Sequence, residues 1–137
     1  MTLRRKSREF ALQMLFEWDM ARQDPARVEQ LFWKSARASD ETRRFANQLF
    51  EGAAAQAQTS DQQVGKLSES WRLDRLAAVD RNILRLALYE LRAGTAPPKV
   101  VIDEALELAK KFSSAEAPAF LNGILDAALK SLALESE

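Results

Sequence analysis

The sequence contains no cysteine and no histidine, and these two absences exclude several kinds of chemistry at once. Without cysteine there is no disulfide, no thiol nucleophile and no zinc site built on thiolates. Without histidine there is no imidazole to act as a general acid or base near neutral pH. The sequence therefore argues against an enzyme, and it predicts neither a metal site nor a cofactor.

Glycine is also scarce, with four residues spread over the 137-residue chain. They form neither the G-x-x-x-x-G-K-[ST] loop nor the G-x-G-x-x-G turn that cradles phosphates. Asp103, Glu104 and Glu107 place three carboxylates close together in the sequence. Such a group can flank a substrate or hold a divalent ion, but a solvated helix face explains it better.

Long apolar runs are missing as well. No uninterrupted apolar stretch approaches the roughly 18 residues that a membrane-spanning helix needs. The basic N-terminus is not followed by the apolar segment and cleavage site of a secretory signal. We therefore expect a cytoplasmic protein that does not enter a membrane.

The net charge is zero, because 20 Lys and Arg residues balance 20 Asp and Glu residues. A neutral protein has no overall field that attracts a polyanion, so any anion binding must come from local patches. Hydrophobic residues make up 47% of the chain, which is enough for the core of a single domain.

Apolar residues at helical spacing dominate the rest of the sequence, and no segment alternates as a strand does. We predict an all-α fold with an N-terminal helical half, about residues 1–66, and a C-terminal helical half, about residues 70–134. The predicted helices cover about residues 6–22, 26–38, 40–64, 79–93, 100–112 and 118–134. The segment 79–94 leaves little room for a polar face, so it should be the central buried helix. Gly52 falls inside a predicted helix, where a close helix crossing would explain it. Gly94 is expected to end the helix of the segment 79–94.

Four cations stand within five residues of the N-terminal stretch TLRRKSREFALQMLFEW, residues 2–18. They are Arg4, Arg5, Lys6 and Arg8. A helix N-terminus disfavours each of them by a few tenths of a kcal/mol, and Arg4 repels Arg8 at i,i+4 by roughly 0.2–0.5 kcal/mol. Folding alone gives no reason for this cluster. Two interpretations stay open: a solvated terminus, or an arm that orders on the phosphates of RNA.

A second apolar stripe follows on the same predicted helix. Leu12, Phe16 and Met20 recur at i, i+4 and i+8, on the side away from the arc formed by Phe10, Met14 and their neighbours. A helix that packs on one side only does not need this stripe. It is either buried against another helix or forms a docking surface for a protein partner.

Four segments occur in an order and at a spacing that resemble one known family. They read RRKSREFALQMLFEW, VDRNILRLALYEL, VVIDEALELAKKF and FLNGILD. Each is weak alone, but together they are specific. From about residue 4 to residue 126 the chain resembles the NusB family of bacterial transcription antitermination factors.

The resemblance implies a single domain over residues 1–137, with two three-helix bundles packed across one another. It implies a non-enzymatic RNA-binding adaptor. Members of the family bind the single-stranded boxA element of ribosomal RNA leader transcripts together with NusE, a small-subunit ribosomal protein. Other Nus factors and RNA polymerase are implied as indirect partners, and the chain is expected to be a monomer or a homodimer.

The resemblance also assigns roles to individual positions. The RNA-binding positions of the family fall on Arg4, Arg5, Lys6, Arg8, Lys99 and Phe120. The positions that meet NusE fall on Phe16, within the stripe of Leu12, Phe16 and Met20, and on Asp80 of the VDR motif.

The segment SSAEAPAF, residues 113–120, departs from the family pattern. Ala117 stands where a capping Ser is usual, which costs roughly 1 kcal/mol of helix capping. Ala119 stands where a basic residue is common, so RNA contacts from this loop should be weaker. For the neighbouring Asn122 and Gly123 we favour structural roles, in which Gly123 admits a neighbouring helix and Asn122 bonds to nearby backbone.

Two other functions stay open at this point. A NusB-like helical domain also precedes the catalytic domain of some ribosomal RNA cytosine methyltransferases, and these 137 residues would then be a detached accessory domain. Alternatively, the chain is a helical scaffold or homodimer that binds only protein and covers its basic arm.

Overall fold

The computed structural model describes residues 2–136, apart from the side chains of residue 69 and residues 134–136. Its regular elements are all helices, which confirms the predicted all-α fold. The α-helices are α1 (Leu3–Ala21), α2 (Pro25–Ser35), α3 (Asp40–Ala55), α4 (Ala57–Leu67), α5 (Ala78–Ala93), α6 (Pro98–Phe112) and α7 (Ala117–Ser136). Two short 3₁₀ turns, Glu69–Trp71 and Leu73–Arg75, lead from α4 to α5.

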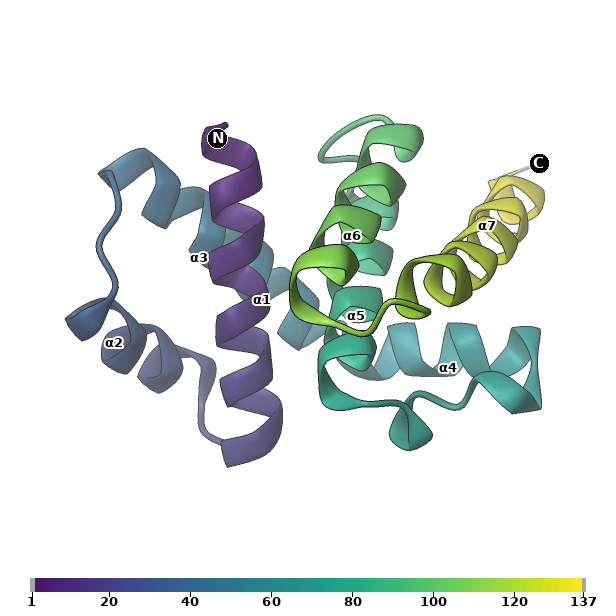
Figure 1. Ribbon diagram of the computed structural model, residues 1–137, viewed down its shortest axis with the longest axis horizontal. Helices are drawn as coiled ribbons and strands as arrows, with labels where there is room; N and C mark the ends of the chain where they lie inside the picture. Colours follow the sequence, from purple (N-terminus) through teal and green to yellow (C-terminus); the bar gives the residue numbers. More distant parts are fainter. Residues whose placement is uncertain (1, 137) are drawn as a thin grey trace.

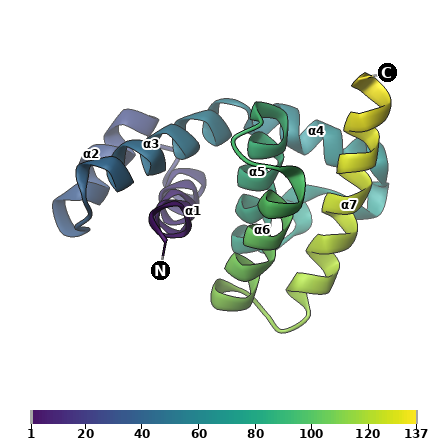
Figure 2. The ribbon, with the colours of Figure 1, turned by 90° about the horizontal axis from the view of Figure 1, so that it is seen from above.

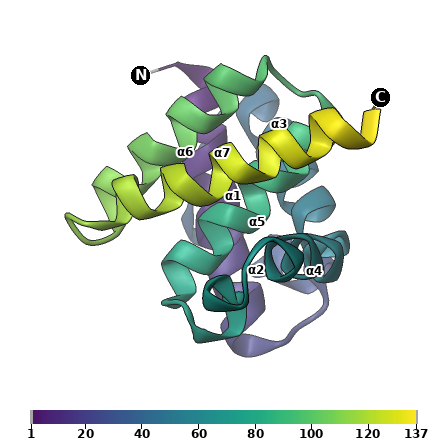
Figure 3. The same cartoon turned by 90° about the vertical axis from the view of Figure 1, so that its right-hand side faces the viewer.

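The helices form two groups that meet along α1, α3 and α5. Figure 1 shows α1, α2 and α3 on one side and α4 to α7 on the other. Figure 2 shows α3 running from α2 toward α4, so that it spans both groups. Figure 3 shows α7 crossing over α5. Helix α5 packs against α1, α3, α4, α6 and α7, which makes it the central helix, as its sequence predicts.

The predicted helix over residues 40–64 is wrong in one respect, because the structure divides it into α3 and α4 at Gln56. Gln56 has φ −103° and ψ 12°, outside the α-helical region. Its side chain accepts a hydrogen bond from Nε of Arg92, 3.1 Å away on α5. Neither glycine nor proline marks this break. The contacts of α4 with α5 and α7 turn the chain here, and the local sequence carries no signal of them.

Two of the four glycines have the roles that the sequence predicts. A Cβ atom added to Gly52 would overlap the ring of Tyr89, so glycine permits the close crossing of α3 and α5. Gly94 ends α5 in the left-handed region, with φ +68°, where glycine carries no steric penalty.

A pair of glutamates connects α2 and α3. Burial, together with the hydrogen bond and charge of Glu51, raises the pKa of Glu29 from 4.5 to about 8. A carboxyl with a raised pKa in the folded state stabilises the protein most below its unfolded pKa and loses that contribution as pH rises through the folded pKa. The contribution of Glu29 to the free energy of unfolding should therefore fall between about pH 4.5 and pH 8.

The variant Glu29→Gln keeps a neutral hydrogen-bonding side chain at this position at every pH. We expect its Tm to exceed that of the unaltered protein by about 3 °C at pH 9, which corresponds to about 1 kcal/mol after allowance for solvent screening. At pH 5 the two proteins should have the same Tm. Thermal melts from pH 5 to pH 9 test this, with the exposed Glu41→Gln on α3 as control. Parallel curves for the unaltered protein and Glu29→Gln would contradict the assignment.

Candidate nucleic-acid and partner interface

The first turns of α1 carry the four predicted cations. Thr2 caps this helix, because its hydroxyl oxygen accepts a hydrogen bond from the backbone N–H of Arg5 at 3.1 Å. No acidic residue lies in the first turn to offset the cations. Arg4, Arg5 and Lys6 are exposed, whereas Arg8 is buried.

Arg8 has a structural role, and its prediction as an RNA-binding residue is contradicted by its position. Its side chain is 3% exposed and pairs with Glu90 on α5. Nε and Nη2 of Arg8 donate to the two carboxylate oxygens of Glu90 at 2.9 and 2.8 Å. The hydroxyl of Thr95 donates to the same carboxylate at 2.7 Å. The view that folding gives no reason for the cluster is therefore wrong for Arg8.

Arg5 divides its interactions between solvent and α6. Its Nε and Nη2 donate to the two oxygens of Glu104 at 3.0 and 3.2 Å, while the Arg5 side chain remains 44% exposed. The hydrogen bond and charge of Glu104 raise the pKa of Arg5. An exposed pair of this kind contributes little to stability because solvent screens it, so a phosphate can compete for the guanidinium.

Arg4 and Lys6 lie over aromatic rings instead of beside carboxylates. The guanidinium carbon of Arg4 is 4.7 Å from the centre of the Phe45 ring on α3. Nζ of Lys6 is 5.0 Å from the centre of the Phe10 ring. Such contacts orient a cation without neutralising it. The N–H donors of both residues therefore remain available to an anion.

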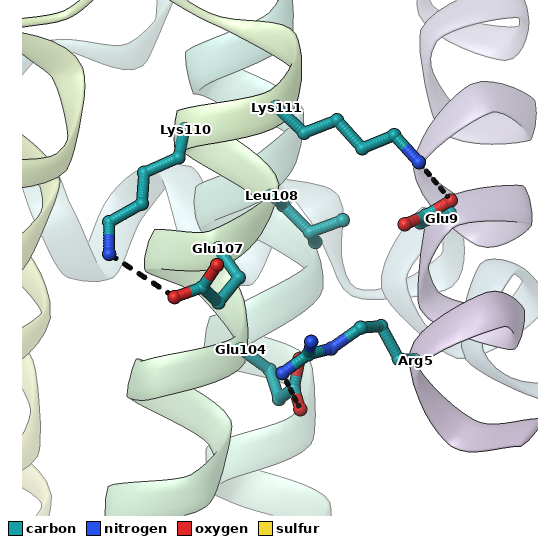
Figure 4. A pocket seen from close by; sticks show the side chains of 7 residues that line it. All are labelled: Arg5, Glu9, Glu104, Glu107, Leu108, Lys110 and Lys111. Atoms are coloured by element: carbon teal, nitrogen blue, oxygen red, sulfur yellow. Dashed lines mark hydrogen bonds and ion pairs between the residues drawn. The ribbon is translucent and has the colours of Figure 1, made fainter. Parts of the chain in front are cut away.

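A cleft of about 260 Å³ separates the start of α1 from α6. Figure 4 shows its lining, which consists of Arg5, Glu9, Glu104, Glu107, Leu108, Lys110 and Lys111. Lys111 pairs with Glu9 at 2.9 Å, and Lys110 pairs with Glu107 at 3.2 Å. Two of the three carboxylates that the sequence marked on α6, Glu104 and Glu107, thus form ion pairs along this cleft. Among the described residues, no group of three or more acidic side chains is placed to hold a metal ion.

Further along α1 the surface becomes apolar. A groove of about 260 Å³ is lined by Leu12, Gln13, Phe16, Glu17, Val79 and Phe112. Phe16 is 38% exposed and Met20 is 61% exposed, so both present apolar surface to solvent. Leu12 is 3% exposed and belongs to the core, which makes the prediction of Leu12 as a free docking residue wrong. Leu12 nevertheless lines the groove, one helical turn before Phe16.

Asp80 lies at the edge of this groove, next to Val79 in the first turn of α5. Its carboxylate accepts a hydrogen bond from the hydroxyl of Ser113, directly after α6. Asp80 is half-buried. The structure thus brings Asp80 and Phe16 to the same surface, although they are 64 positions apart in the sequence.

The structure does not bring Lys99 and Phe120 together. Lys99 is exposed in the first turn of α6, at the end of the molecule where α1 begins (Figure 1). Phe120 is exposed in the first turn of α7, beyond the opposite end of α6. A helix of this length separates them by about 20 Å. Lys99 therefore lies near the cationic turn of α1, whereas Phe120 lies at the end where α6 leads into α7.

The structural roles expected for Gly123 and for Ala117, which lie on either side of Phe120, are both wrong. Asn122 and Gly123 are both exposed, and nothing lies within 4 Å of a Cβ atom built on Gly123. Gly123 therefore does not admit a neighbouring helix. Ala117 is the first helical residue of α7 and is buried, so it does not occupy the exposed position of a capping side chain.

A charged network near the end of α1 was not found from the sequence. Asp19 accepts hydrogen bonds from Nη2 of Arg81 at 2.7 Å and from Nδ2 of Asn82 at 3.1 Å, and it lies 3.3 Å from Nη1 of Arg85. Burial by itself would raise the pKa of Asp19, but these hydrogen bonds and the nearby charges outweigh burial and lower it. The network fixes the end of α1 against α5, and so fixes the walls of the apolar groove.

Together these features define an all-α binding protein, with an exposed cationic turn at one end of a helix and an apolar groove further along it. The NusB family model matches residues 5–130, and the chain belongs to the NusB family. "Transcription antitermination protein NusB" of Koribacter versatilis is 47% identical over 134 residues, covering 96% of this chain and 92% of the relative. The protein of the same name from Symbiobacterium thermophilum is 40% identical, covering 94% and 90%.

Solved structures agree with this membership. NusB of T. maritima is 34% identical and superposes with a TM-score of 0.83, covering 94% of this chain and 92% of that chain. A crystal structure of the antitermination factors NusB and NusE in complex with double-stranded RNA contains a chain that is 28% identical, with a TM-score of 0.83 and coverage of 96% and 98%. Within residues 2–136 of the present structure, no helix is both long and apolar enough to cross a membrane.

Proposed function

We propose that this protein is a non-enzymatic RNA-binding adaptor in transcription antitermination. In this role it binds the single-stranded boxA element of ribosomal RNA leader transcripts together with NusE, and through NusE it joins other Nus factors and RNA polymerase. Because bacterial transcription takes place in the cytoplasm, we expect the protein to act there. The observation that carries the proposal is the exposed cationic turn of Arg4, Arg5 and Lys6, which the fold leaves available to phosphates.

Related proteins also support this proposal. One NusB chain of the same fold has been crystallised with NusE and double-stranded RNA. The curated relatives at 40–47% identity are antitermination proteins.

A single-stranded RNA that contacts three cations should give a log–log salt slope near −2, because each phosphate contributes about −0.7. A titration of boxA RNA at several salt concentrations, with and without NusE, tests the function, and salt-independent or absent binding in both arms would overturn it.

The apolar groove is the proposed docking site for NusE, with Phe16 as its central contact and with Met20 and Asp80 beside it. Phe16 follows the buried Leu12 by one helical turn, both residues line the groove, and Phe16 stays 38% exposed. Exposed aromatic residues of this kind carry much of the binding energy at protein interfaces.

The variant Phe16→Asp should weaken NusE binding at least about 30-fold, the loss expected for removing a residue worth about 2 kcal/mol. The far-ultraviolet circular dichroism spectrum should stay helical, and the affinity for RNA alone should not change. The matched control is Leu31→Asp on α2, which introduces the same charge at a similarly exposed apolar residue far from the groove. Loss of helical signal would show that Phe16 belongs to the core, and unchanged NusE binding would exclude the groove as the docking site.

A further inference from the structure

A second concentration of positive charge lies at the corner between α2 and α3, on the outer side of the molecule in Figure 1. A cavity of about 340 Å³ lies there, lined by Trp33, Lys34, Ala36, Arg37, Ala38 and Arg43. Three of these residues are cationic and none is acidic. A larger cavity of about 520 Å³ shares Trp33, Lys34 and Arg43 with it. We call the two adjoining cavities the α2–α3 groove.

The three cations of this groove form no ion pair with a described side chain, whereas several arginines elsewhere in the fold do. Arg8, Arg81 and Arg85 each pair with a carboxylate at 3.3 Å or less. Among the described side chains, none of Lys34, Arg37 and Arg43 has a carboxylate within ion-pair distance. All three are exposed. Their charge is therefore not balanced by an ion pair within the described part of the protein.

The wall of the groove is held rigidly. The indole N–H of Trp33 donates to Oδ1 of Asn47 at 2.8 Å. The Trp33 ring meets Phe10 and Phe32 edge-on, with ring centres 5.2 and 4.9 Å apart. The guanidinium of Arg43 lies 5.1 Å from the centre of the Trp33 ring. A fixed aromatic wall with a cation already placed on it loses little entropy when an anion binds.

The one acidic residue that lines the groove, in the larger cavity, does not oppose an anion at neutral pH. This residue is Glu29, whose pKa of about 8 keeps its carboxyl mostly protonated at pH 7. The smaller cavity, with Lys34, Arg37 and Arg43, has no acidic residue in its lining, and Glu51, whose charge helps to raise the pKa of Glu29, lines neither cavity.

The groove is also close to the cationic turn of α1. Nζ of Lys6 lies 5.0 Å from the centre of the Phe10 ring, and the centre of the Phe10 ring lies 5.2 Å from that of Trp33. Arg43 lies over the other end of this series of contacts, 5.1 Å from the centre of the Trp33 ring. Because two aromatic rings in contact connect Lys6 to Arg43, one extended strand can reach both the cationic turn and the α2–α3 groove.

We propose that the α2–α3 groove binds the phosphate backbone of single-stranded RNA and extends the RNA path beyond the cationic turn of α1. This inference rests on the proposed function, because it lengthens the site for the same strand. Lys34 and Arg37 contact phosphates, Arg43 orients them from the Trp33 ring, and no base is read here. The groove therefore adds affinity without adding sequence specificity.

The test compares two RNAs, a short boxA RNA and the same RNA extended by unstructured nucleotides on both sides. The double variant Lys34→Ala/Arg37→Ala removes two contacts and leaves Arg43 on the Trp33 ring. For the unaltered protein, the long RNA should give a salt slope steeper by about 1.4 and bind roughly 25-fold more tightly at 0.1 M salt. The double variant should lose this increment and keep the affinity of the unaltered protein for the short RNA.

The matched control is Lys66→Ala/Lys130→Ala, which removes two exposed cations from α4 and α7 and should keep the full increment. If the groove variant binds the long RNA as tightly as the unaltered protein, or loses the same factor on both RNAs, the groove does not extend the path. If the unaltered protein binds neither RNA in a salt-dependent way, both the groove and the proposed function fail. Binding of the short RNA that depends on Arg4, Arg5 and Lys6, without any length increment, overturns the groove alone.

Discussion

Replacing Arg8 by Ala is expected to lower the free energy of unfolding by about 3–5 kcal/mol, the cost of leaving one member of a buried ion pair without its partner. The carboxylate of Glu90 would remain buried between α1 and α5, with the Thr95 hydroxyl as its remaining donor among the contacts described above. For a chain of 137 residues this corresponds to a fall in Tm of about 10–20 °C. Thermal and urea unfolding monitored by circular dichroism measure the effect.

The control for this prediction restores the packing instead of the charge. In the double variant Arg8→Met/Glu90→Leu, both buried charges are replaced by apolar side chains of similar size, and such replacements are often neutral or stabilising. We expect it to recover most of the lost stability. Arg4→Ala, at the same helix end, should change the free energy of unfolding by less than about 0.5 kcal/mol. A Tm for Arg8→Ala equal to that of the unaltered protein would return Arg8 to the set of RNA-binding candidates.

Replacing Arg4, Arg5 and Lys6 together by Ala is expected to lower the affinity for single-stranded RNA about 100-fold at 0.1 M salt. The estimate follows from three phosphates, each contributing about 0.7 to the log–log salt slope, so that the slope itself should flatten by about 2. Stability should change little, because Arg4 and Lys6 are exposed cations whose contacts with aromatic rings are weak at exposed sites, and because the Arg5–Glu104 pair is exposed. Fluorescence anisotropy at four or more salt concentrations measures both quantities.

The matched control for the triple variant removes the same charge elsewhere, from Lys66, Arg75 and Lys130, which are exposed on α4, on the second 3₁₀ turn and on α7. This control should keep the steep slope, since the proposed path of the RNA does not include those three residues. Equal flattening in both variants would show that the RNA responds to the overall charge of the protein and not to the turn of α1.

Periodicity predicted the helices and the core faces well, because each depends on residues close in sequence. The central position of α5, the crossing at Gly52 and the end of α5 at Gly94 all follow from local patterns. The stripe of Leu12, Phe16 and Met20 was also found this way, but periodicity alone could not separate Leu12, under the groove, from Phe16, at its surface. That distinction depends on Val79 and Phe112, which come from other helices.

The cationic cluster shows where sequence reasoning ends. Four cations in five residues form one pattern, yet the fold divides them. Arg8 finds Glu90 at a separation of 82 residues, and Arg5 finds Glu104 at a separation of 99. No local rule predicts such pairs, because they form only after α1 packs against α5 and α6. The break at Gln56 has the same origin, since the contacts of α4 with α5 and α7 decide it.

The most direct test of this account is the affinity of two variants for the same boxA RNA at 0.1 M salt. One variant is Arg8→Met/Glu90→Leu, and the other is the triple replacement of Arg4, Arg5 and Lys6 by Ala. The account predicts that the first binds RNA as tightly as the unaltered protein, while the second binds about 100-fold more weakly. If the first variant is folded and loses affinity as the second does, or if the second loses none, then the division of the cluster into a structural arginine and three RNA-binding cations is contradicted.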